Sequence, residues 1–308
     1  MNATTAAALA RDVSVARTVA GHAGVRPLAE REFRQFQALI YREAGIHLAE
    51  CKHALLVGRL SRRIRELGLP SFGAYYERVA DGGDAAERVR MLDAICTHET
   101  HFFREPRHFE YLERTVFPRW KAEAQAGRRT KRIRVWSAAC SSGEEPYTLA
   151  MLLLEHFPAA DGWDAEVLAT DLSTRVLERA RAGLWAMSKA HQIPQRLLKK
   201  YMLKGTRSQE GLMAASPELR ARVRFARVNL NDARYPVAGR FDLVFCRNVL
   251  IYFDAASRAG VVERLLEHVA PDGLFFLGHA ETLNNVTTRA RAVVPTVYAP
   301  VPAPARAA

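Results

Sequence analysis

The sequence offers little that would place the chain in a membrane or in an oxidising compartment. Its 308 residues include only 4 cysteines, which are too widely spaced to form a zinc-binding or redox pair: Cys51, Cys96, Cys140 and Cys246. No apolar run approaches the ~20 residues needed to cross a bilayer. The first 25 residues also lack the continuous apolar core of a signal peptide. We therefore expect a protein of the reducing cytoplasm that inserts no segment into a membrane.

Several common binding motifs are absent as well. There is no Gly-x-Gly-x-x-Gly fingerprint for a dinucleotide, no Walker-type phosphate loop and no serine elbow. The 10 histidines show no metal-binding spacing, and His98 and His101 are too isolated to count as ligands, so we expect no metal. Cys140 has no histidine near it in the sequence and is interpreted as a small packing residue.

The formal net charge of +12 is the main compositional signal. A basic chain favours an anionic partner, such as nucleic acid, a membrane surface or an acidic protein. A preference for arginine without any function would give the same charge. The composition is otherwise that of a soluble globular protein, with 49% hydrophobic and 25% charged residues. Both interpretations of the charge therefore remain open.

The N-terminal part of the chain predicts a small helical domain. Residues 1–25 are expected to form a disordered tail. From 26 to 96, apolar residues recur at helical spacing, and glycine-containing breaks divide this stretch into roughly four helices. Residues 97–105 are polar, aromatic and irregular, and a helix is expected at 108–119. We interpret 97–110 as an inter-domain linker.

Strands and helices alternate from about 111 to 300, the pattern of a doubly wound, Rossmann-like parallel sheet. The predicted strands are 132–137, 165–170, 223–228, 241–246 and 274–278, with a further strand pair within 293–298. Residues 184–222 interrupt this alternation, and 301–308 form a tail of low complexity. The predicted fold class is α/β, with a helical bundle in front of the sheet domain.

The most informative segment is 132–147, a strand followed by a loop of small residues and a helix start. Such a unit binds nucleotide-like ligands at the carboxyl end of the strand, and Pro146 suits the first turn of a helix. Glu144 and Glu145 would repel the phosphate that a helix N-terminus otherwise favours. S-adenosylmethionine fits these acids, because it carries ribose hydroxyls, an ammonium and a sulfonium but no phosphate.

Polar residues also follow the other predicted strands. Asp171 ends the second strand, Asn229 the third, and Arg247 and Asn248 the fourth. In a parallel sheet these ends share one edge, and an acid at the position of Asp171 can accept hydrogen bonds from both ribose hydroxyls. Polar residues end many strands for structural reasons alone, but their recurrence after successive strands favours a binding site.

Together these residues resemble the CheR family of chemotaxis receptor methyltransferases. The resemblance rests on stretches that follow one another in the same order as in the family: 97–105, 135–147, 169–173, 228–230, 245–253 and 271–279. It implies an S-adenosylmethionine-dependent methyltransferase domain in which 184–222 forms a small antiparallel β-subdomain. It also implies a protein-glutamate O-methyltransferase that converts glutamates of transmembrane chemoreceptors to methyl esters and releases S-adenosylhomocysteine.

The resemblance also implies a set of cofactor-binding residues. They are His98, Thr100, Arg104, Glu145, Asp171, Asn229, Leu230, Arg247 and Asn248. His98 stands where the family usually has asparagine, and both residue types can donate a hydrogen bond. Arg104 and Tyr252 are the candidates for orienting the acceptor carboxylate, although an inter-domain clamp and a core tyrosine are the structural alternatives.

The partner expected from the resemblance is the set of cytoplasmic methylation helices of the chemoreceptors, which are acidic. Arg59, Arg62 and Arg63 share one helix face and are predicted to dock on those helices, with a solvated helix face or a nucleic-acid contact as alternatives. Some family members also bind a tethering peptide through a Gly-Thr-Gly turn. Here the turn reads Gly205-Thr206-Arg207, so we predict independence of the tether, and we expect a monomer.

Two other functions remain as alternatives. The charge favours a methyltransferase acting on nucleic acid, but the Asn/Asp-Pro-Pro-Tyr/Phe motif of amino-methylating enzymes is missing. A non-catalytic scaffold that binds S-adenosylmethionine as a sensor is the third possibility. We predict receptor methylation and no nucleic-acid partner.

Overall fold

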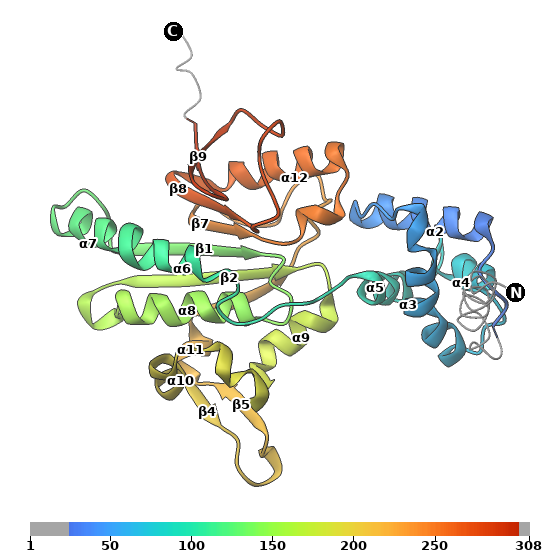
Figure 1. The fold of residues 1–308 in the computed structure, drawn as a ribbon, viewed down its shortest axis with the longest axis horizontal. Coiled ribbons are helices and arrows are strands. Elements are labelled where there is room, and N and C mark those ends of the chain that lie inside the picture. The colour runs from blue at the N-terminus through green and yellow to red at the C-terminus, as the bar shows by residue number, and fades with distance from the viewer. Residues whose placement is uncertain (1–24, 302–308) are drawn as a thin grey trace, which may run out of the picture. The chain divides into compact units, whose positions relative to one another are not determined.

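The structure, a computed structural model, describes residues 25–301 (Figure 1). The predicted tails, 1–25 and 301–308, therefore lie almost wholly outside the described residues. The chain divides into two compact units. The first runs up to Arg42 and includes Leu48–Ile95, and the second combines Glu43–His47 with the chain from Cys96 onward. Within 25–301 no helix combines the length and apolar character needed to span a bilayer.

The first unit is the predicted helical bundle. Among its described residues, the α-helices are α2 (Glu30–Ala44), α3 (His53–Glu66), α4 (Phe72–Val79) and α5 (Ala85–Ile95), with a short 3-10 turn η1 at Glu50–Lys52. Each α-helix buries apolar side chains at helical spacing. The bundle core consists of Phe33, Phe36, Leu39, Ile40, Leu56, Leu60, Ile64, Phe72, Tyr75, Val79, Met91 and Leu92.

A buried acid joins two of these helices. Glu87 of α5 is 0% exposed and accepts hydrogen bonds from Arg63 Nε at 2.8 Å and Arg63 Nη2 at 2.6 Å. The Tyr75 hydroxyl donates to the same carboxylate at 3.0 Å. Burial raises the pKa of Glu87, but the hydrogen bonds from Arg63 and Tyr75 outweigh it and hold the pKa below its ordinary value. Arg63 therefore fastens α3 to α5.

The second unit contains a seven-stranded sheet in the order β6-β2-β1-β7-β8-β10-β9. Its strands are β1 (Arg132–Ala138), β2 (Asp164–Asp171), β6 (Val223–Arg227), β7 (Phe241–Cys246), β8 (Val269–Leu277), β9 (Ala290–Val294) and β10 (Val297–Pro300). The pairs from β6 to β8 are parallel, and β10 and β9 add an antiparallel edge. The strand order reverses direction at β1, so the switch point lies between β1 and β7. The predicted α/β class is confirmed.

Helices cover both faces of this sheet. One apolar layer packs the sheet against α6 (Pro106–Tyr111), the π-helical turn η2 (Leu112–Val116), α7 (Phe117–Gln125), α8 (Glu144–His156) and α9 (Thr174–Ala182). A second layer packs it against α12 (Ala255–Glu267). Short 3-10 turns follow α8, at Ala159–Asp161 (η3), and β7, at Leu250–Tyr252 (η6).

The predicted insertion is confirmed as a small antiparallel sheet in the order β3-β5-β4. Its strands are β3 (Leu184–Ala186), β4 (Met202–Lys204) and β5 (Leu212–Ala215). Between and after them lie η4 (Met187–Gln192), α10 (Gln195–Tyr201), η5 (Arg207–Gln209) and α11 (Pro217–Ala221). Trp185, Met213 and Ala215 join the apolar layer of α8, so the insertion shares a core with the main sheet.

Two elements begin earlier than the sequence indicated. Helix α6 starts at Pro106, within the segment 97–110 that we interpreted as a linker. Strand β8 starts at Val269, before the predicted strand 274–278. Val269 pairs with Phe241 and Leu274 with Leu243, so residues 270–273 stand opposite Asp242 alone and form an irregular bulge, which tolerates Pro271. A Cβ on Gly273 would lie 2.9 Å from the Asp242 carbonyl oxygen, so this close approach favours glycine.

The ion pair between Arg63 and Glu87 can be tested by substitution. Arg63→Met removes the two-pronged partner of the buried Glu87 carboxylate and leaves it the ion pair with Arg90, whose Nη1 lies 3.3 Å from Oε2 and whose side chain is exposed. The free energy of unfolding should therefore fall by about 3 kcal/mol at pH 7. This loss of unfolding free energy should become smaller in acid. The pKa of Glu87 is lower in the folded than in the unfolded protein, so its ionised form stabilises the fold at pH values above the unfolded-state pKa of ~4.3. That contribution disappears as the pH falls through the folded-state pKa. Urea denaturation followed by circular dichroism, with hydrogen exchange of α3 and α5, measures both effects.

The matched control is Arg62→Met. Arg62 pairs only at the surface with Glu66, at 2.8 Å and with 85% of the arginine side chain exposed. Its loss should cost less than about 0.5 kcal/mol. Equal effects of the two substitutions would contradict a structural role for Arg63.

Candidate functional site

The loop after β1 bends sharply at the edge of the sheet. Ala139, Ser141 and Gly143 have positive φ angles of 70°, 50° and 98°. A Cβ on Gly143 would lie 3.0 Å from the Cβ of Ala180 in α9, so both the backbone conformation and the close approach require glycine here. The small residues recognised in the sequence therefore allow the loop to turn directly into α8.

Asp171 binds this loop to the end of β2. Its Oδ2 accepts the Ser141 N–H at 2.8 Å and its Oδ1 accepts the Ser173 N–H at 2.9 Å. The Cys140 N–H also donates to the Thr170 carbonyl oxygen at 2.8 Å. Only 8% of Asp171 is exposed. The carboxylate is thus fixed where the carboxyl ends of β1 and β2 meet, beside the switch point.

The two acids at the start of α8 have different partners. Glu144 is fully buried, forms an ion pair with Lys189 of η4 and accepts the Ser142 hydroxyl at 2.7 Å. Glu145 accepts the Ser137 hydroxyl at 2.6 Å through Oε1. Burial raises the pKa of Glu145, and the nearby Arg247 guanidinium opposes this increase. Glu144 is therefore part of the interior, and Glu145 belongs to the sheet edge.

Arg247, just past the end of β7, contacts several of the other predicted residues. Its side chain is 1% exposed, and its Nη2 donates to the Arg104 carbonyl oxygen at 2.6 Å. Its Nε lies 3.2 Å from Glu145 Oε2 and 3.7 Å from Glu105 Oε2. The guanidinium also lies 5.5 Å from the Phe109 ring centroid. Arg247 therefore ties the end of β7 to α8 and to the segment before α6.

Glu281 is a site residue that the sequence reasoning missed. Its Oε2 accepts the N–H groups of Asn248 at 2.8 Å and Gly278 at 2.7 Å, and its Oε1 accepts the Leu250 N–H at 2.8 Å. These bonds hold Asn248 in a left-handed conformation with φ of 58°. A Cβ on Gly278 would lie 2.4 Å from Asn248 Nδ2, so glycine is required. The only sequence signal was the position of Glu281, just past the matching stretch 271–279.

The segment before α6 supplies three of the predicted residues. The His98 carbonyl oxygen accepts the Ser141 hydroxyl at 3.1 Å, which joins the segment to the β1 loop. Arg104 Nη1 donates to the Glu99 carbonyl oxygen at 2.9 Å. Thr100 lies between them and is half-buried. The predicted linker is therefore an ordered part of the sheet edge.

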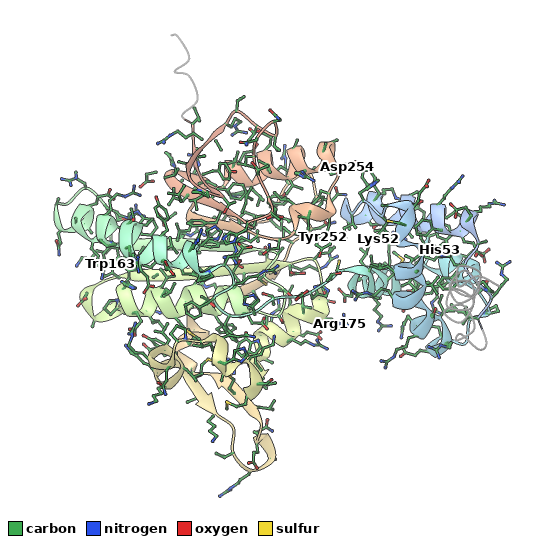
Figure 2. The ribbon with its side chains drawn as sticks, in the orientation of Figure 1. Lys52, His53, Trp163, Arg175, Tyr252 and Asp254 are labelled. Carbon is green, nitrogen blue, oxygen red and sulfur yellow. The ribbon has the colours of Figure 1, made fainter. Side chains whose placement is uncertain are left out.

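Asn229 and Tyr252 contact the segment Glu43–His47, which sequence reasoning had placed in the helical domain. Asn229 Nδ2 donates to the Glu43 carbonyl oxygen at 2.6 Å, and the neighbouring Leu230 is buried. Tyr252, labelled in Figure 2, is half-buried at the end of η6. Its carbonyl oxygen accepts the His47 N–H at 2.8 Å. All of these residues belong to the second unit.

The predicted docking residues Arg59, Arg62 and Arg63 belong instead to α3 of the first unit. Arg59 and Arg62 are exposed, whereas only 26% of the Arg63 side chain is exposed because it binds Glu87. The structure therefore leaves two of the three arginines on an accessible helix face.

The comparisons with known proteins agree with this arrangement. Residues 31–96 match the all-alpha domain of CheR methyltransferases, and residues 98–299 match the CheR methyltransferase SAM binding domain. The chain belongs to the CheR methyltransferase family. As a family member it is an S-adenosylmethionine-dependent methyltransferase. The carboxyl ends of its parallel strands, next to the switch point between β1 and β7, are where α/β sheets usually bind such ligands.

Named relatives cover most of the chain. The chemotaxis protein methyltransferase of Salmonella typhimurium strain LT2 is 40% identical over 273 residues, which is 88% of this chain and 91% of that protein. Its Escherichia coli K12 counterpart is 39% identical over the same shares. Chemotaxis protein methyltransferase 2 of Pseudomonas aeruginosa PAO1 is 38% identical over 87% of this chain and 92% of that protein. The CheR likeness thus includes both units.

From the Lys189–Glu144 ion pair we predict that the insertion stabilises the start of α8 at the carboxyl end of the sheet. Lys189→Met leaves the buried Glu144 carboxylate without its counter-charge and should cost about 2 kcal/mol of unfolding free energy. The value lies below that for fully buried pairs because 34% of the Lys189 side chain is exposed. Urea denaturation followed by tryptophan fluorescence measures it.

Lys199→Met, at an exposed position of α10, is the matched control and should change the unfolding free energy by less than about 0.5 kcal/mol. Adding Glu144→Gln to Lys189→Met should recover part of the loss, because a neutral amide costs less to bury than an unpaired carboxylate. A stable Lys189→Met protein would contradict the role of the pair.

Proposed function

We propose that this chain methylates glutamate side chains of chemoreceptors and so forms glutamyl methyl esters and S-adenosylhomocysteine. The main support is that chemotaxis protein methyltransferases match 88% of the chain in both units. The fixed Asp171 carboxylate beside the switch point supports the cofactor part of the proposal. A cytoplasmic, monomeric enzyme acting on the cytoplasmic methylation helices of the receptors is the form we expect.

The proposed cofactor position uses the sheet edge. Two backbone N–H groups fix the Asp171 carboxylate at the carboxyl end of β2, and the ribose hydroxyls would donate hydrogen bonds to it. Asn229 and Leu230 would flank the adenine. The other side of the cofactor would face residues of the segment before α6 and of the β1 and β7 ends, namely His98, Thr100, Arg104, Glu145, Arg247 and Asn248. Glu144 is excluded because Lys189 and Ser142 occupy its carboxylate.

The reaction needs no general base. A glutamate carboxylate is ionised at neutral pH, and one of its oxygens attacks the methyl carbon of the sulfonium. The new C–O bond forms while the S–C bond breaks, and the electron pair of that bond stays on sulfur. A negative and a positive charge are thereby neutralised, so removal of water and in-line placement should supply most of the acceleration.

Arg104 and Tyr252 are proposed to position the acceptor carboxylate. The backbone of Arg104 is held by Arg247, and its guanidinium is steadied by the Glu99 carbonyl oxygen. The remaining guanidinium N–H groups suit a carboxylate, which arginine binds in a planar, bidentate manner. The Tyr252 hydroxyl would donate the second hydrogen bond from the turn after β7.

Receptor docking is proposed for the exposed arginines of α3. Arg59 and Arg62 would face the acidic methylation helices and steer their approach. The Arg63 charge is already used by Glu87, so we retain Arg63 as a structural residue of the same helix. Reversing the charges of Arg59 and Arg62 should therefore weaken receptor methylation mainly at low salt.

Independence of a peptide tether also remains a prediction, with a changed physical basis. Arg207 adopts a φ of 54°, the left-handed conformation that favours glycine. The turn therefore keeps this backbone conformation with arginine in place of the second glycine, so the glycine is not needed for the conformation. What supports independence is the exposed arginine side chain, which would stand where a peptide backbone has to approach closely.

The test is methyl transfer with labelled S-adenosylmethionine and receptor-containing membranes. We expect base-labile label on receptor protein, because methyl esters hydrolyse in alkali. Arg104→Ala should reduce the rate by about 100-fold or more, since positioning of charged groups has effects of that size. Arg107→Ala, at an exposed position three residues later, is the matched control and should retain the wild-type rate.

The alternative functions give different results in the same assay. Label in added nucleic acid would favour the interpretation based on the net charge of +12. Cofactor binding without any transfer would favour a sensor. A near-normal rate in Arg104→Ala, with the fold intact by circular dichroism, would contradict the proposed positioning role.

A further inference from the structure

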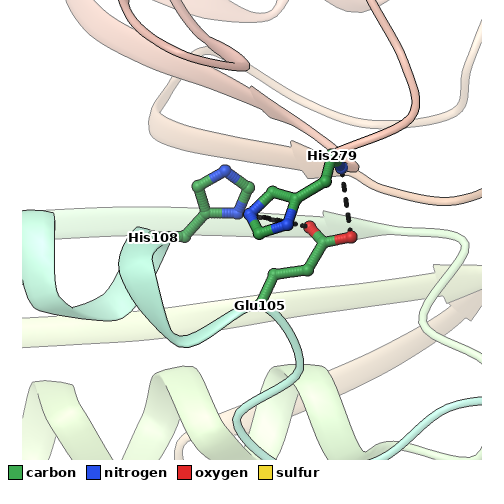
Figure 3. A group of neighbouring side chains, drawn as sticks. All are labelled: Glu105, His108 and His279. Carbon is green, nitrogen blue, oxygen red and sulfur yellow. Dashed lines mark hydrogen bonds and ion pairs between the residues drawn. The ribbon is translucent and has the colours of Figure 1, made fainter.

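Three potential metal ligands meet beside the sheet edge. Glu105, His108 and His279 each offer one ligand atom, and these atoms all lie within 4.8 Å of one another. Figure 3 shows the Glu105 carboxylate turned towards both imidazole rings. Glu105 Oε2 is 3.6 Å from His108 Nδ1 and 4.0 Å from His279 Nε2. All three residues belong to the second unit.

The carboxylate is held in this direction by the backbone and by a neighbouring amide. Glu105 Oε1 accepts the His279 N–H at 3.1 Å and Asn248 Nδ2 at 3.1 Å. Its other oxygen, Oε2, is buried and accepts no hydrogen bond, although the Arg247 guanidinium lies 3.7 Å away as an ion-pair partner. A buried carboxylate oxygen without a hydrogen-bond partner is rare in folded proteins and needs an explanation, such as an ion at that position.

His108 is equally well oriented. Its Nε2 lies 2.8 Å from the Thr296 hydroxyl, and its ring packs edge-on against Phe276 with the centroids 5.4 Å apart. Histidine ligands typically use one ring nitrogen for the metal and hydrogen-bond through the other, which fixes the tautomer. Here the remaining nitrogen, Nδ1, faces Glu105.

We propose that Glu105, His108 and His279 form a binding site for a divalent first-row transition ion, for which zinc is the probe. Two imidazoles and a carboxylate are a common ligand set for zinc, with bonds of about 2.0–2.2 Å, so tetrahedral ligand atoms lie about 3.4 Å apart. Glu105 Oε2 lies 3.6 and 4.0 Å from the two histidine nitrogens, and all three ligand atoms lie within 4.8 Å of one another, so the side chains would have to close in by up to about 1.4 Å. The His279 side chain is 50% exposed, which gives the ion an entry path and the ring freedom to move.

Arg247 competes for the same atoms. Its Nη1 lies 3.3 Å from His108 Nδ1 and its Nε lies 3.7 Å from Glu105 Oε2. A bound cation would displace the guanidinium from these two contacts, and Arg247 would keep Glu145 and the Arg104 carbonyl oxygen as partners. Zinc should therefore shift Arg247 towards the edge where we propose that the cofactor binds.

The consequence is antagonism between zinc and S-adenosylmethionine. This part rests on the proposed cofactor position, whereas the zinc site itself does not. Because coupling between two ligands is reciprocal, zinc should weaken cofactor binding by the same factor by which the cofactor weakens zinc binding. Methyl transfer at subsaturating cofactor should fall as zinc is added.

The test is isothermal titration calorimetry of the full chain with zinc chloride, without receptor or cofactor. We expect one zinc-binding event that His279→Ala and His108→Gln each weaken by at least about 10-fold. The matched control is His191→Ala, which removes an exposed histidine of η4 whose ring contacts the Ser188 carbonyl oxygen. This substitution should leave zinc binding unchanged.

Equal zinc affinity in the wild type, His279→Ala and His108→Gln would overturn the site, as would the absence of zinc binding. A second titration at saturating S-adenosylmethionine tests the antagonism. If zinc affinity falls in His279→Ala but is the same with and without S-adenosylmethionine, the zinc site would be supported and the antagonism overturned. None of these readouts depends on receptor methylation, so failure of the proposed function and failure of the zinc site are distinguishable.

Discussion

The buried charge of Arg247 is the interaction on which the sheet edge depends. A guanidinium with 1% exposure is tolerable only where opposite charges and acceptors compensate it. Here they are the Glu145 carboxylate at 3.2 Å, the Glu105 carboxylate at 3.7 Å and the Arg104 carbonyl oxygen, which accepts a hydrogen bond. These acceptors come from segments far apart in the sequence. One charge therefore holds the end of β7, the start of α8 and the segment before α6 together.

Ion pairs also explain the two acids that follow the small-residue loop. Glu144 forms an ion pair with Lys189 of the insertion, and Glu145 forms one with Arg247, so no phosphate is needed to stabilise the loop. Asp171 adds two bonds to backbone N–H groups and fixes the loop against β2. A site built from internal ion pairs suits a phosphate-free, positively charged cofactor better than it suits a dinucleotide.

Much of the fold was predictable because it depends on short-range patterns. Strand β7 was placed at 241–246, as observed, because a short apolar run is a local signal. The bend of small residues that contains Gly143 was recognised for the same reason. Glu281 and the pairing of Arg63 with Glu87 were missed, since nothing near these residues in the sequence indicates their partners. The histidine spacing gave no sign of the Glu105 cluster for the same reason.

The sequence by itself determined the helical bundle, the alternating sheet domain with its insertion, and the set of polar residues at the strand ends. Only the tertiary structure decided the role of each charge. It paired Arg63 with the buried Glu87, gave Glu144 and Glu145 different partners, and brought His279 to Glu105. The physical reason is that secondary structure follows local propensity and periodicity, whereas the partner of a buried charge is chosen by contacts between distant segments.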